Sequence, residues 1–297
     1  MIDKLEFLLA LARERHFARA AEVCGVTQPT LSAGVKQLEE TFGVLLVHRG
    51  SRFRDFTPEG ERVLTWARRI VGDARAMRDE VQALKHGLAG DLRLAAVPTA
   101  VAVIERLMTP YRKRHPNVQF TVRSRSSEDI LRLLENLEID AGVTYLDEGP
   151  LGRVTAIPLY RERYHLLISG DAPLGRRDKV TWAEAAQVPL CLLTPEMQAR
   201  RIIDRLIRKA GGNPQPTLQS DAMILLFAHV RAGRLASIMP AQLAATLGLT
   251  DVLRAIPIVE PEASNSIGLV VPAREPMKPL TAALVKEARR VAPSLAD

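Results

Sequence analysis

An apolar repeat in the first third of the chain limits the folds open to it. Between residues 63 and 88, apolar side chains recur at alternating steps of four and three residues: Val63, Ala67, Ile70, Ala74, Met77, Val81, Leu84 and Leu88. Such steps, kept for more than three heptads, are typical of a helix that pairs with another helix. At 1.5 Å per residue this helix is about 40 Å long, longer than a small domain can cover. The repeat predicts a long connecting helix whose seam meets a partner; the alternative is a helix packed only on its own domain.

The first sixty residues indicate short helices joined by tight turns. Apolar residues follow helical spacing in residues 5–12, a second short helix covers residues 18–24, and Gly25 follows it as a terminator that accepts positive φ. A third helix has one apolar face that we expect to be buried, formed by Leu31, Val35, Leu38 and Phe42. Two helices joined by a short turn that contains glycine predict a helix-turn-helix.

The opposite face of the third helix carries short or amide-bearing side chains at its start. The residues there are Thr27, Gln28, Pro29, Thr30 and Ser32, and Lys36 follows one turn later. Glutamine can donate and accept at an adenine edge, hydroxyls adapt to bases or phosphates, and free N–H groups at a helix start attract phosphate. We therefore expect these residues to contact DNA, as the leading end of a recognition helix does. Gly34 indicates either the close approach of a neighbour, DNA or the first helix, or simple tolerance.

A basic stretch follows the third helix. Residues 48–54, HRGSRFR, hold three arginines and no acid around a Gly-Ser turn. This composition suits a short hairpin, or wing, whose Arg49, Arg52 and Arg54 lie along a phosphate backbone and add affinity with little sequence discrimination. The net charge of +7 is compatible with a polyanionic partner. The alternative is a solvated basic turn.

From residue 91 the pattern changes to alternating strands and helices. Helical stretches such as residues 101–114 and 128–137 separate short apolar or β-branched runs: LRLAAV, VQFTV, AGVTY, HLLIS, LCLL and SIGLVV. This alternation predicts an α/β domain on a largely parallel sheet. In such sheets small ligands bind beyond the C-terminal ends of the strands.

Two strand-to-helix junctions in this region carry hydroxyl groups. Pro98, Thr99 and Ala100 lead out of the first strand, and Ser126 and Ser127 follow the second. A hydroxyl beside free N–H groups at such an edge suits a small anion. The alternative is that Thr99 and Ser127 are only helix N-caps, each contributing about 1 kcal/mol.

Several other classes of protein are disfavoured. There is no GxSxG motif, phosphate-binding loop or GxGxxG after a strand, and the histidines and cysteines lack metal-ligand spacing, so we expect no enzyme, no metal site and no cofactor. Cys24 and Cys191 are expected to be reduced, buried thiols. No apolar run approaches the roughly 18 residues of a membrane span, and Glu6, Arg13 and Arg15 break the pattern of a secretion signal. We expect a cytoplasmic protein with no membrane partner.

The N-terminal segment resembles that of LysR-type transcriptional regulators. The residues that carry the resemblance are Phe17, Ala20, Ala21, Val26, Thr27, Gln28, Pro29, Leu31, Ser32, Val35, Leu38, Glu39, Gly43, Leu46, Arg49, Thr57 and Gly60. The resemblance implies an N-terminal all-α winged helix-turn-helix in residues 1–59, a dimerising linker helix in residues 60–90 and a C-terminal α/β effector-binding domain in residues 91–297. Ala33-Gly34 departs from the family's pattern, which leaves the recognition face small and gives more weight to Lys36.

The same resemblance implies where an effector binds. The effector domain is similar to periplasmic binding proteins, with one subdomain in residues 91–162 and 266–297 and another in residues 163–265, and the co-inducer lies in the cleft between them. Thr99 and Ser127, with their neighbours Pro98, Ala100 and Ser126, match positions that contact the co-inducer. Thr194 and Met197 belong to the facing wall, and Tyr145 or Arg125 closes the site.

The implied function is a regulator that binds double-stranded promoter DNA and responds to a small-molecule co-inducer. It forms a homodimer through the linker helix and a homotetramer through the effector domains. The segments MIDKLEFLLALARERHF and RGSRFRDFTPEGERVL resemble regulators that accompany formate dehydrogenase operons, which implies formate or another small carboxylate as the co-inducer. Two alternatives are a ligand-independent repressor that uses the α/β domain only for assembly, and an enzyme that acquired a DNA-binding module.

Overall fold

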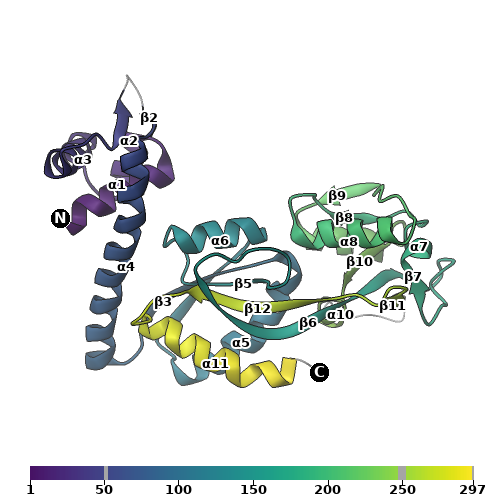
Figure 1. Cartoon of the computed structure of the whole chain (residues 1–297). Coiled ribbons are helices and arrows are strands. Elements are labelled where there is room, and N and C mark those ends of the chain that lie inside the picture. Colours follow the sequence, from purple (N-terminus) through teal and green to yellow (C-terminus); the bar gives the residue numbers. More distant parts are fainter. Residues whose placement is uncertain (50–52, 247–251, 296–297) are drawn as a thin grey trace. The chain divides into compact units, whose positions relative to one another are not determined.

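A computed structural model describes residues 1–49, 53–246 and 252–295, which form two compact units (Figure 1). The first unit contains Met1–Leu88 with two short segments, Glu135–Glu138 and Arg274–Pro279, and the second contains the rest of the described chain. Buried apolar side chains fill the interior of each unit.

The first unit consists of three short helices, a small hairpin and one long helix. The elements are α1 (Ile2–Glu14), α2 (Phe17–Val23), α3 (Gln28–Phe42), β1 (Val47–Arg49), β2 (Phe53–Phe56) and α4 (Pro58–His86). Strands β1 and β2 pair antiparallel between α3 and α4. The predicted winged helix-turn-helix followed by a long helix is confirmed.

Short polar signals set the ends of α3 and α4. The hydroxyl of Thr27 accepts a hydrogen bond from the backbone N–H of Thr30 at 3.4 Å, and Gly43 ends α3 in the left-handed region with φ of 67°. Thr57 begins α4 in the same way and accepts from the N–H of Gly60 at 2.9 Å. Pro58 stands in the first turn of α4, where its missing N–H is not needed.

The apolar face of α3 packs as predicted except at its end. Leu31, Val35 and Leu38 are completely buried against the other helices of the unit. Phe42, which we expected in the core, is 44% exposed. It is the last residue of α3, and the next residue, Gly43, is exposed as well, so the packed part of the helix ends before it.

Two glycines allow close packing within this unit. A Cβ atom on Gly34 would lie 2.6 Å from Cδ2 of Phe7 in α1, so this glycine is explained by the approach of the first helix. A Cβ atom on Gly60 would lie 2.1 Å from the carbonyl oxygen of Leu46. Gly60 therefore lets the first turn of α4 contact the segment that leads into the hairpin. The buried carboxylate of Glu39 fixes the same segment by accepting from the N–H of Leu46 at 3.0 Å.

Helix α4 packs one face within the first unit and leaves another exposed. Leu64, Ala67 and Val71 are buried. Four members of the predicted heptad and one tryptophan are exposed large apolar side chains: Trp66, Ile70, Met77, Val81 and Leu84. Within the chain itself, this seam is therefore accessible to a partner helix.

The second unit is built on a mixed β-sheet with strand order β4-β3-β5-β12-β6-β11-β7, and β10 also pairs with β6. The strands are β3 (Gly90–Ala96), β4 (Val118–Ser124), β5 (Ala141–Tyr145), β6 (Val154–Ser169), β7 (Val180–Thr181), β10 (Ser237–Pro240), β11 (Leu253–Val259) and β12 (Ser264–Pro272). A separate parallel pair is formed by β8 (Cys191–Leu193) and β9 (Leu218–Ser220). The expectation of a largely parallel sheet is correct for β4-β3-β5 but wrong for β12, β6, β10 and β11, which pair antiparallel.

Helices cover both faces of this sheet. They are α5 (Val101–Arg114), which follows the short helix η1 (Pro98–Ala100), and α6 (Ser127–Glu135), α7 (Trp182–Ala185), α8 (Gln198–Lys209), α9 (Met223–Arg231), α10 (Ala241–Thr246) and α11 (Pro279–Leu295). In Figure 1, α6 lies on one side of β5 and β12, and α5 and α11 lie on the other. The predicted α/β class is confirmed.

Strands β6 and β12 connect the two halves of the second unit. The first part of β6 pairs with β12, up to Arg163 opposite Ser264. From Tyr164 onward β6 lies between β10, which pairs with Tyr164–Leu167, and β11, which pairs with His165–Ser169. The crossing between the halves therefore lies near residues 163 and 264. The subdomain boundaries given above stay a prediction.

The contact at Gly60 generates a stability prediction. We expect Gly60→Ala to lower the free energy of unfolding by about 2 kcal/mol, because the clash with the Leu46 carbonyl outweighs the gain of about 1 kcal/mol in helix propensity. Thermal unfolding of the full-length protein, followed by circular dichroism, measures this. Arg62→Ala, at an exposed position on the same helix, is the control and should change stability by no more than about 0.5 kcal/mol. Equal stability of the two variants would contradict the packing role of Gly60.

Candidate functional site

The predicted DNA-contacting residues of α3 lie on its accessible side. Gln28, Pro29, Thr30 and Lys36 are exposed and Ser32 is half-buried. The hydroxyls of Thr27 and Thr30 are 2.8 Å apart, so they form one polar group at the helix start. Lys36 Nζ lies 3.6 Å from the Glu40 carboxylate, an exposed pair of a kind that contributes little to stability and leaves the ammonium accessible.

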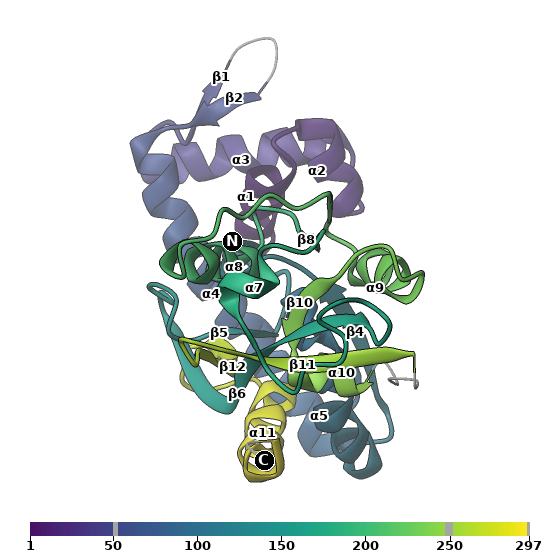
Figure 2. The same ribbon diagram turned by 90° about the vertical axis from the view of Figure 1, so that its right-hand side faces the viewer.

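The hairpin carries part of the predicted basic wing. Arg54 is exposed on β2. Arg49 ends β1, but its side chain and the whole of Arg52 lie outside the described residues. Strands β1 and β2 extend away from the helices of this unit (Figure 2).

The predicted effector-binding residues gather where three parallel strands end. Ala96 at the end of β3 lies opposite Ser124 of β4 on one side and Val143 of β5 on the other. The segments after these strands therefore leave the sheet at the same edge. Pro98, Thr99 and Ala100, all buried, follow β3; Ser126 and Ser127 follow β4; and Tyr145 ends β5. Arg125 is exposed beside them, and its guanidinium donates to the Ser124 carbonyl oxygen at 2.7 Å.

Neither Thr99 nor Ser127 caps a helix. Helix α5 begins without a side-chain cap, and Thr99 Oγ1 instead lies 3.3 Å from the hydroxyl of Tyr145. Helix α6 is capped by Ser126, whose Oγ accepts from the N–H of Asp129 at 3.1 Å. Ser127 Oγ is buried and has no hydrogen-bond partner among the described residues. The capping alternative is therefore wrong for both residues, and Ser127 retains its full hydrogen-bonding capacity.

Tyr145 connects this edge to a buried acid. Its hydroxyl donates to Glu162 Oε2 at 2.7 Å, and the hydroxyl of Tyr160 lies 3.5 Å from Oε1. Glu162 is fully buried, and this burial raises the pKa of its carboxyl to about 7, while hydrogen bonds from Tyr145, Thr99 and Tyr160 oppose the rise and the charge of Asp147 adds to it. Below that pH the side chain is a neutral acid, which can donate a hydrogen bond as well as accept one.

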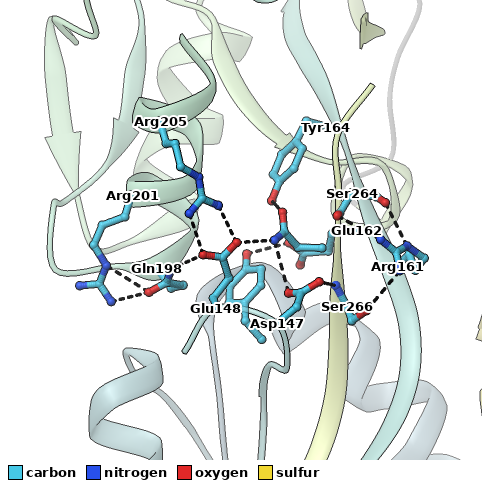
Figure 3. Close-up of polar contacts among 12 residues, drawn as sticks. Asp147, Glu148, Arg161, Glu162, Tyr164, Gln198, Arg201, Arg205, Ser264 and Ser266 are labelled. Atoms are coloured by element: carbon cyan, nitrogen blue, oxygen red, sulfur yellow. Dashed lines mark hydrogen bonds and ion pairs between the residues drawn. The ribbon is translucent and has the colours of Figure 1, made fainter. Parts of the chain in front are cut away.

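A second layer of polar contacts surrounds the acid (Figure 3). Asn265 of β12 lies opposite Glu162 of β6 and accepts from the hydroxyl of Tyr164 at 2.9 Å. The amide nitrogen of Asn265 donates to Glu148 Oε1 at 2.6 Å, and its distance to Asp147 Oδ1 is 3.4 Å. The loop after β5 is thus tied to the strand that returns from the other half of the unit.

Helix α8 approaches the same loop from the other half of the unit. Arg205 donates to both oxygens of Glu148, at 2.6 and 3.0 Å, and Gln198 Nε2 donates to it at 3.1 Å (Figure 3). Arg201 forms an ion pair of 3.1 Å with Glu128 in the first turn of α6.

Two predicted residues belong to this facing side. Met197 is half-buried and directly precedes α8, next to Gln198. Thr194 follows β8, and the N–H of Met197 donates to its carbonyl oxygen at 3.0 Å. Because Gln198 of α8 contacts Glu148, the segment with Thr194 and Met197 lies close to the loop after β5.

Sequence reasoning missed the acid and the polar residues around it. A signal for Glu162 was present: in YRERYH, residues 160–165, side chains alternate between the two faces of the strand, which places Glu162 on the face of two tyrosines. Asp147, Glu148 and Asn265 had no comparable signal, because their partners are distant in sequence. Gln198, Arg201 and Arg205 lie on one side of a helix whose neighbours only the fold reveals.

The described part of the chain has no candidate metal site and no candidate membrane-spanning helix. Within it, no group of three or more histidine, cysteine or acidic side chains is placed to hold a metal ion. None of the helices in it is both long and apolar enough to cross a membrane.

Comparison with known families covers both units. Residues 2–61 match the model described as "Bacterial regulatory helix-turn-helix protein, lysR family", and residues 85–293 match the "LysR substrate binding domain". Together the two models cover nearly the whole chain.

Named relatives and solved structures agree with this assignment. The transcriptional dual regulator OxyR of Escherichia coli K12 is 26% identical over 278 residues, which cover 93% of this chain and 91% of OxyR. A full-length OxyR variant from Pseudomonas aeruginosa has a TM-score of 0.77 at 25% identity, over 98% of this chain and 99% of that one. The structure of full-length CbnR with its target DNA has the same fold, with a TM-score of 0.62 at 23% identity over 98% of this chain and 100% of CbnR. The chain therefore belongs to the LysR family: it is a DNA-binding transcriptional regulator with an effector-binding domain, and not an enzyme.

Proposed function

We propose that this regulator binds promoter DNA through α3 and the basic wing and is controlled by a small carboxylate, such as formate, bound next to Thr99. The observation that carries the effector assignment is the cluster of Thr99, Tyr145 and Glu162, which joins the ends of the parallel strands to the strand that crosses between the two halves of the effector domain. A protein that acts on a promoter must meet chromosomal DNA, so we place it in the cytoplasm.

For DNA, the proposed base reader is Gln28. It is exposed in the first turn of α3, beside Thr27, Pro29 and Thr30, where a recognition helix enters the major groove. Ser32 and Lys36 extend the surface along the helix. Arg49, Arg52 and Arg54 of the wing supply phosphate contacts. Gly34 packs on Phe7 of α1, so it faces the first helix and not DNA.

For assembly, two surfaces support a homodimer and a homotetramer. The first is the exposed apolar seam of α4, which includes Met77, Val81 and Leu84 and suits a second α4. The effector domain also exposes apolar side chains, namely Val101 on α5, Val122 on the edge strand β4, and Ile224 and Leu225 on α9. Two separate surfaces of this kind allow dimers to pair into a tetramer.

For the effector, a small anion fits the chemistry of the site. Thr99 and Ser127 offer hydroxyls that are not used as caps, and Ser127 Oγ is buried without a partner in the described chain. A protonated Glu162 adds a neutral acid, so a carboxylate near it is not repelled. Thr99 and Tyr145 are each only 2% exposed, which favours a ligand of very few atoms, as formate is.

The relatives' names suggest another signal. Several of them are named hydrogen peroxide-inducible genes activators, and peroxide sensing by cysteine requires an accessible thiolate. Burial raises the pKa of the Cys191 thiol to about 11, and its Sγ lies 3.4 Å from the carbonyl oxygen of Ala236. Burial also raises the pKa of the Cys24 thiol. Both thiols stay protonated near neutral pH, so we favour the carboxylate over peroxide.

DNA binding by α3 and the wing is tested by substitution. On the promoter region beside its own gene, Gln28→Ala should weaken specific binding by about 1 to 3 kcal/mol, since a bidentate base contact is lost. Arg54→Gln should weaken binding to all sequences and reduce the slope of log K against log salt by about one. Gel-shift titrations at several salt concentrations measure both effects. Gln82→Ala, an exposed glutamine on α4, is the matched control.

Retention of full affinity and specificity by a variant that combines Gln28→Ala, Ser32→Ala and Arg54→Gln would exclude this surface as the reader.

The effector assignment is tested by thermal shift with small carboxylates. A ligand at 100 times its Kd stabilises the folded state by about 2.7 kcal/mol, so formate should raise the Tm of the wild type and lose this effect in Thr99→Val. Thr144→Val is the matched control, because Thr144 is a buried threonine on the adjacent strand whose hydroxyl lacks a partner in the described chain. It should retain the shift. No shift with any small carboxylate would favour a ligand-independent repressor.

A further inference from the structure

A cavity lies in the effector domain, beside β6. It has a volume of about 1050 Å³, and its lining comes from β6, the start of β12, α10 and α11. Four lining side chains are basic: Arg161, Arg163, His165 and Arg289. No aspartate or glutamate occurs among the described residues that line it. A cavity of this size accepts an ordinary metabolite, and its charge favours an anion.

The alternation of β6 separates this cavity from the Thr99 cluster. Tyr160, Glu162 and Tyr164 are buried, whereas Arg161 and Arg163, between them in sequence, are exposed. Successive side chains of a strand point to opposite faces, so the acid and the arginines lie on opposite sides of the same strand. The basic cavity is therefore distinct from the proposed carboxylate site.

Arg161 is held in place without being neutralised. Its Nε donates to Ser264 Oγ at 2.9 Å, its Nη2 lies 3.3 Å from the Ser264 carbonyl oxygen, and its Nη1 lies 3.5 Å from Ser266 Oγ (Figure 3). These partners are uncharged, so the guanidinium keeps its full charge. An oriented arginine of this kind is well suited to an oxyanion, because less side-chain freedom is lost when the ligand binds.

Other lining residues have charged or hydrogen-bonding groups that could bind a ligand. Within the described chain, Arg163 and Arg289 have no ion-pair partner, and both are accessible. His165 Nδ1 and Gln242 Oε1 are buried atoms without a hydrogen-bond partner there. The apolar part of the wall includes Ile157, Pro158 and Pro293, which suit the organic portion of a ligand.

We propose that this cavity is a second effector site, which binds a metabolite carrying a multiply charged oxyanion, a phosphate ester or a polycarboxylate. Arg161, Arg163 and Arg289 bind the oxyanion, and the apolar wall contacts the remainder of the molecule. The proposal does not depend on formate at the first site, because in the described chain Arg161, Arg163 and Arg289 have no hydrogen bond with the residues of the Thr99 cluster. Tyr160 is common to both sites, since it lines the cavity and its hydroxyl lies 3.5 Å from Glu162 Oε1.

Its position gives such a ligand a route to the first site. Helix α10 follows β10 in one half of the domain and α11 follows β12 in the other, so a ligand between them contacts both halves. The N–H of Ser266 donates to Asp147 Oδ2 at 2.9 Å. The negative charge of Asp147 in turn raises the pKa of Glu162. A ligand that draws Arg161 away from Ser264 and Ser266 thereby affects the strand that holds the polar cluster.

Calorimetric titration of the full-length protein tests the site. Sodium pyrophosphate and sodium citrate serve as the two probes, and sodium chloride at equal ionic strength is the reference. We expect saturable binding of at least one probe, and we expect Arg161→Gln and Arg289→Gln each to weaken it on the order of tenfold. Which probe binds more tightly distinguishes a phosphate from a polycarboxylate.

The controls separate this site from the other charged surfaces. Arg254→Gln, an exposed arginine on neighbouring β11, should leave binding unchanged. Arg54→Gln should also leave it unchanged, which distinguishes the cavity from the DNA-binding surface, and Thr99→Val should leave it unchanged whether or not formate binds. Arg161, Arg289, Arg254 and Arg54 are all exposed, so each can be substituted without unfolding its domain. Equal binding by wild type and the Arg161 and Arg289 variants, or no saturable heat with either probe at millimolar concentration, would overturn the proposal.

Discussion

The polar interior of the effector domain depends on the hydrogen bonds that the buried carboxyl of Glu162 makes. It lies on β6, close to where this strand leaves β12 and begins to pair with β10, and it accepts from Tyr145, whose own hydroxyl contacts Thr99. Because burial raises its pKa to about 7, the group is close to balance between a neutral acid and a charged carboxylate at physiological pH. A change of charge there alters every hydrogen bond in the cluster. A ligand beside Thr99 is therefore linked to a strand shared by both halves of the domain.

The two faces of β6 divide the chemistry of the domain. One face carries the acid and the hydroxyls of its tyrosines, and the other carries Arg161 and Arg163 in the wall of a basic cavity that Tyr160 also lines. The Glu162 carboxyl and the two arginines point to opposite faces of the strand, so each face can serve a different ligand. Glu148 adds a connection across the domain, since it binds Asn265 on one side and Arg205 of α8 on the other. Because of these contacts, a small movement of one half of the domain relative to the other changes the positions of side chains at both proposed sites.

Local sequence signals predicted the elements well and the site in part. Thr27, Gly43 and Thr57 mark helix ends that depend on neighbouring residues only, and the apolar period of α3 identified its core face up to Leu38. Ser127 shows the limit of such signals: two adjacent serines compete for one cap, and the backbone selects Ser126. The mixed sheet and the partners of Glu162 and Glu148 depend on pairing between distant segments, which no short pattern encodes. Gly34 could be read either way from sequence, and only the distance to Phe7 decides between the readings.

Glu162 titrates with a pKa of about 7 and takes part in effector recognition as a neutral acid at lower pH. Infrared spectroscopy of the full-length protein observes this directly, because the carbonyl stretch of a protonated carboxyl is separate from that of a carboxylate. We expect a protonated carboxyl signal that is present at about pH 6, disappears as the pH rises through about 7 and is absent from Glu162→Gln. The same signal should change when formate is added. A wild-type spectrum without a protonated carboxyl at about pH 6, or one identical to that of Glu162→Gln, would show that Glu162 is ionised there and does not act as a neutral acid.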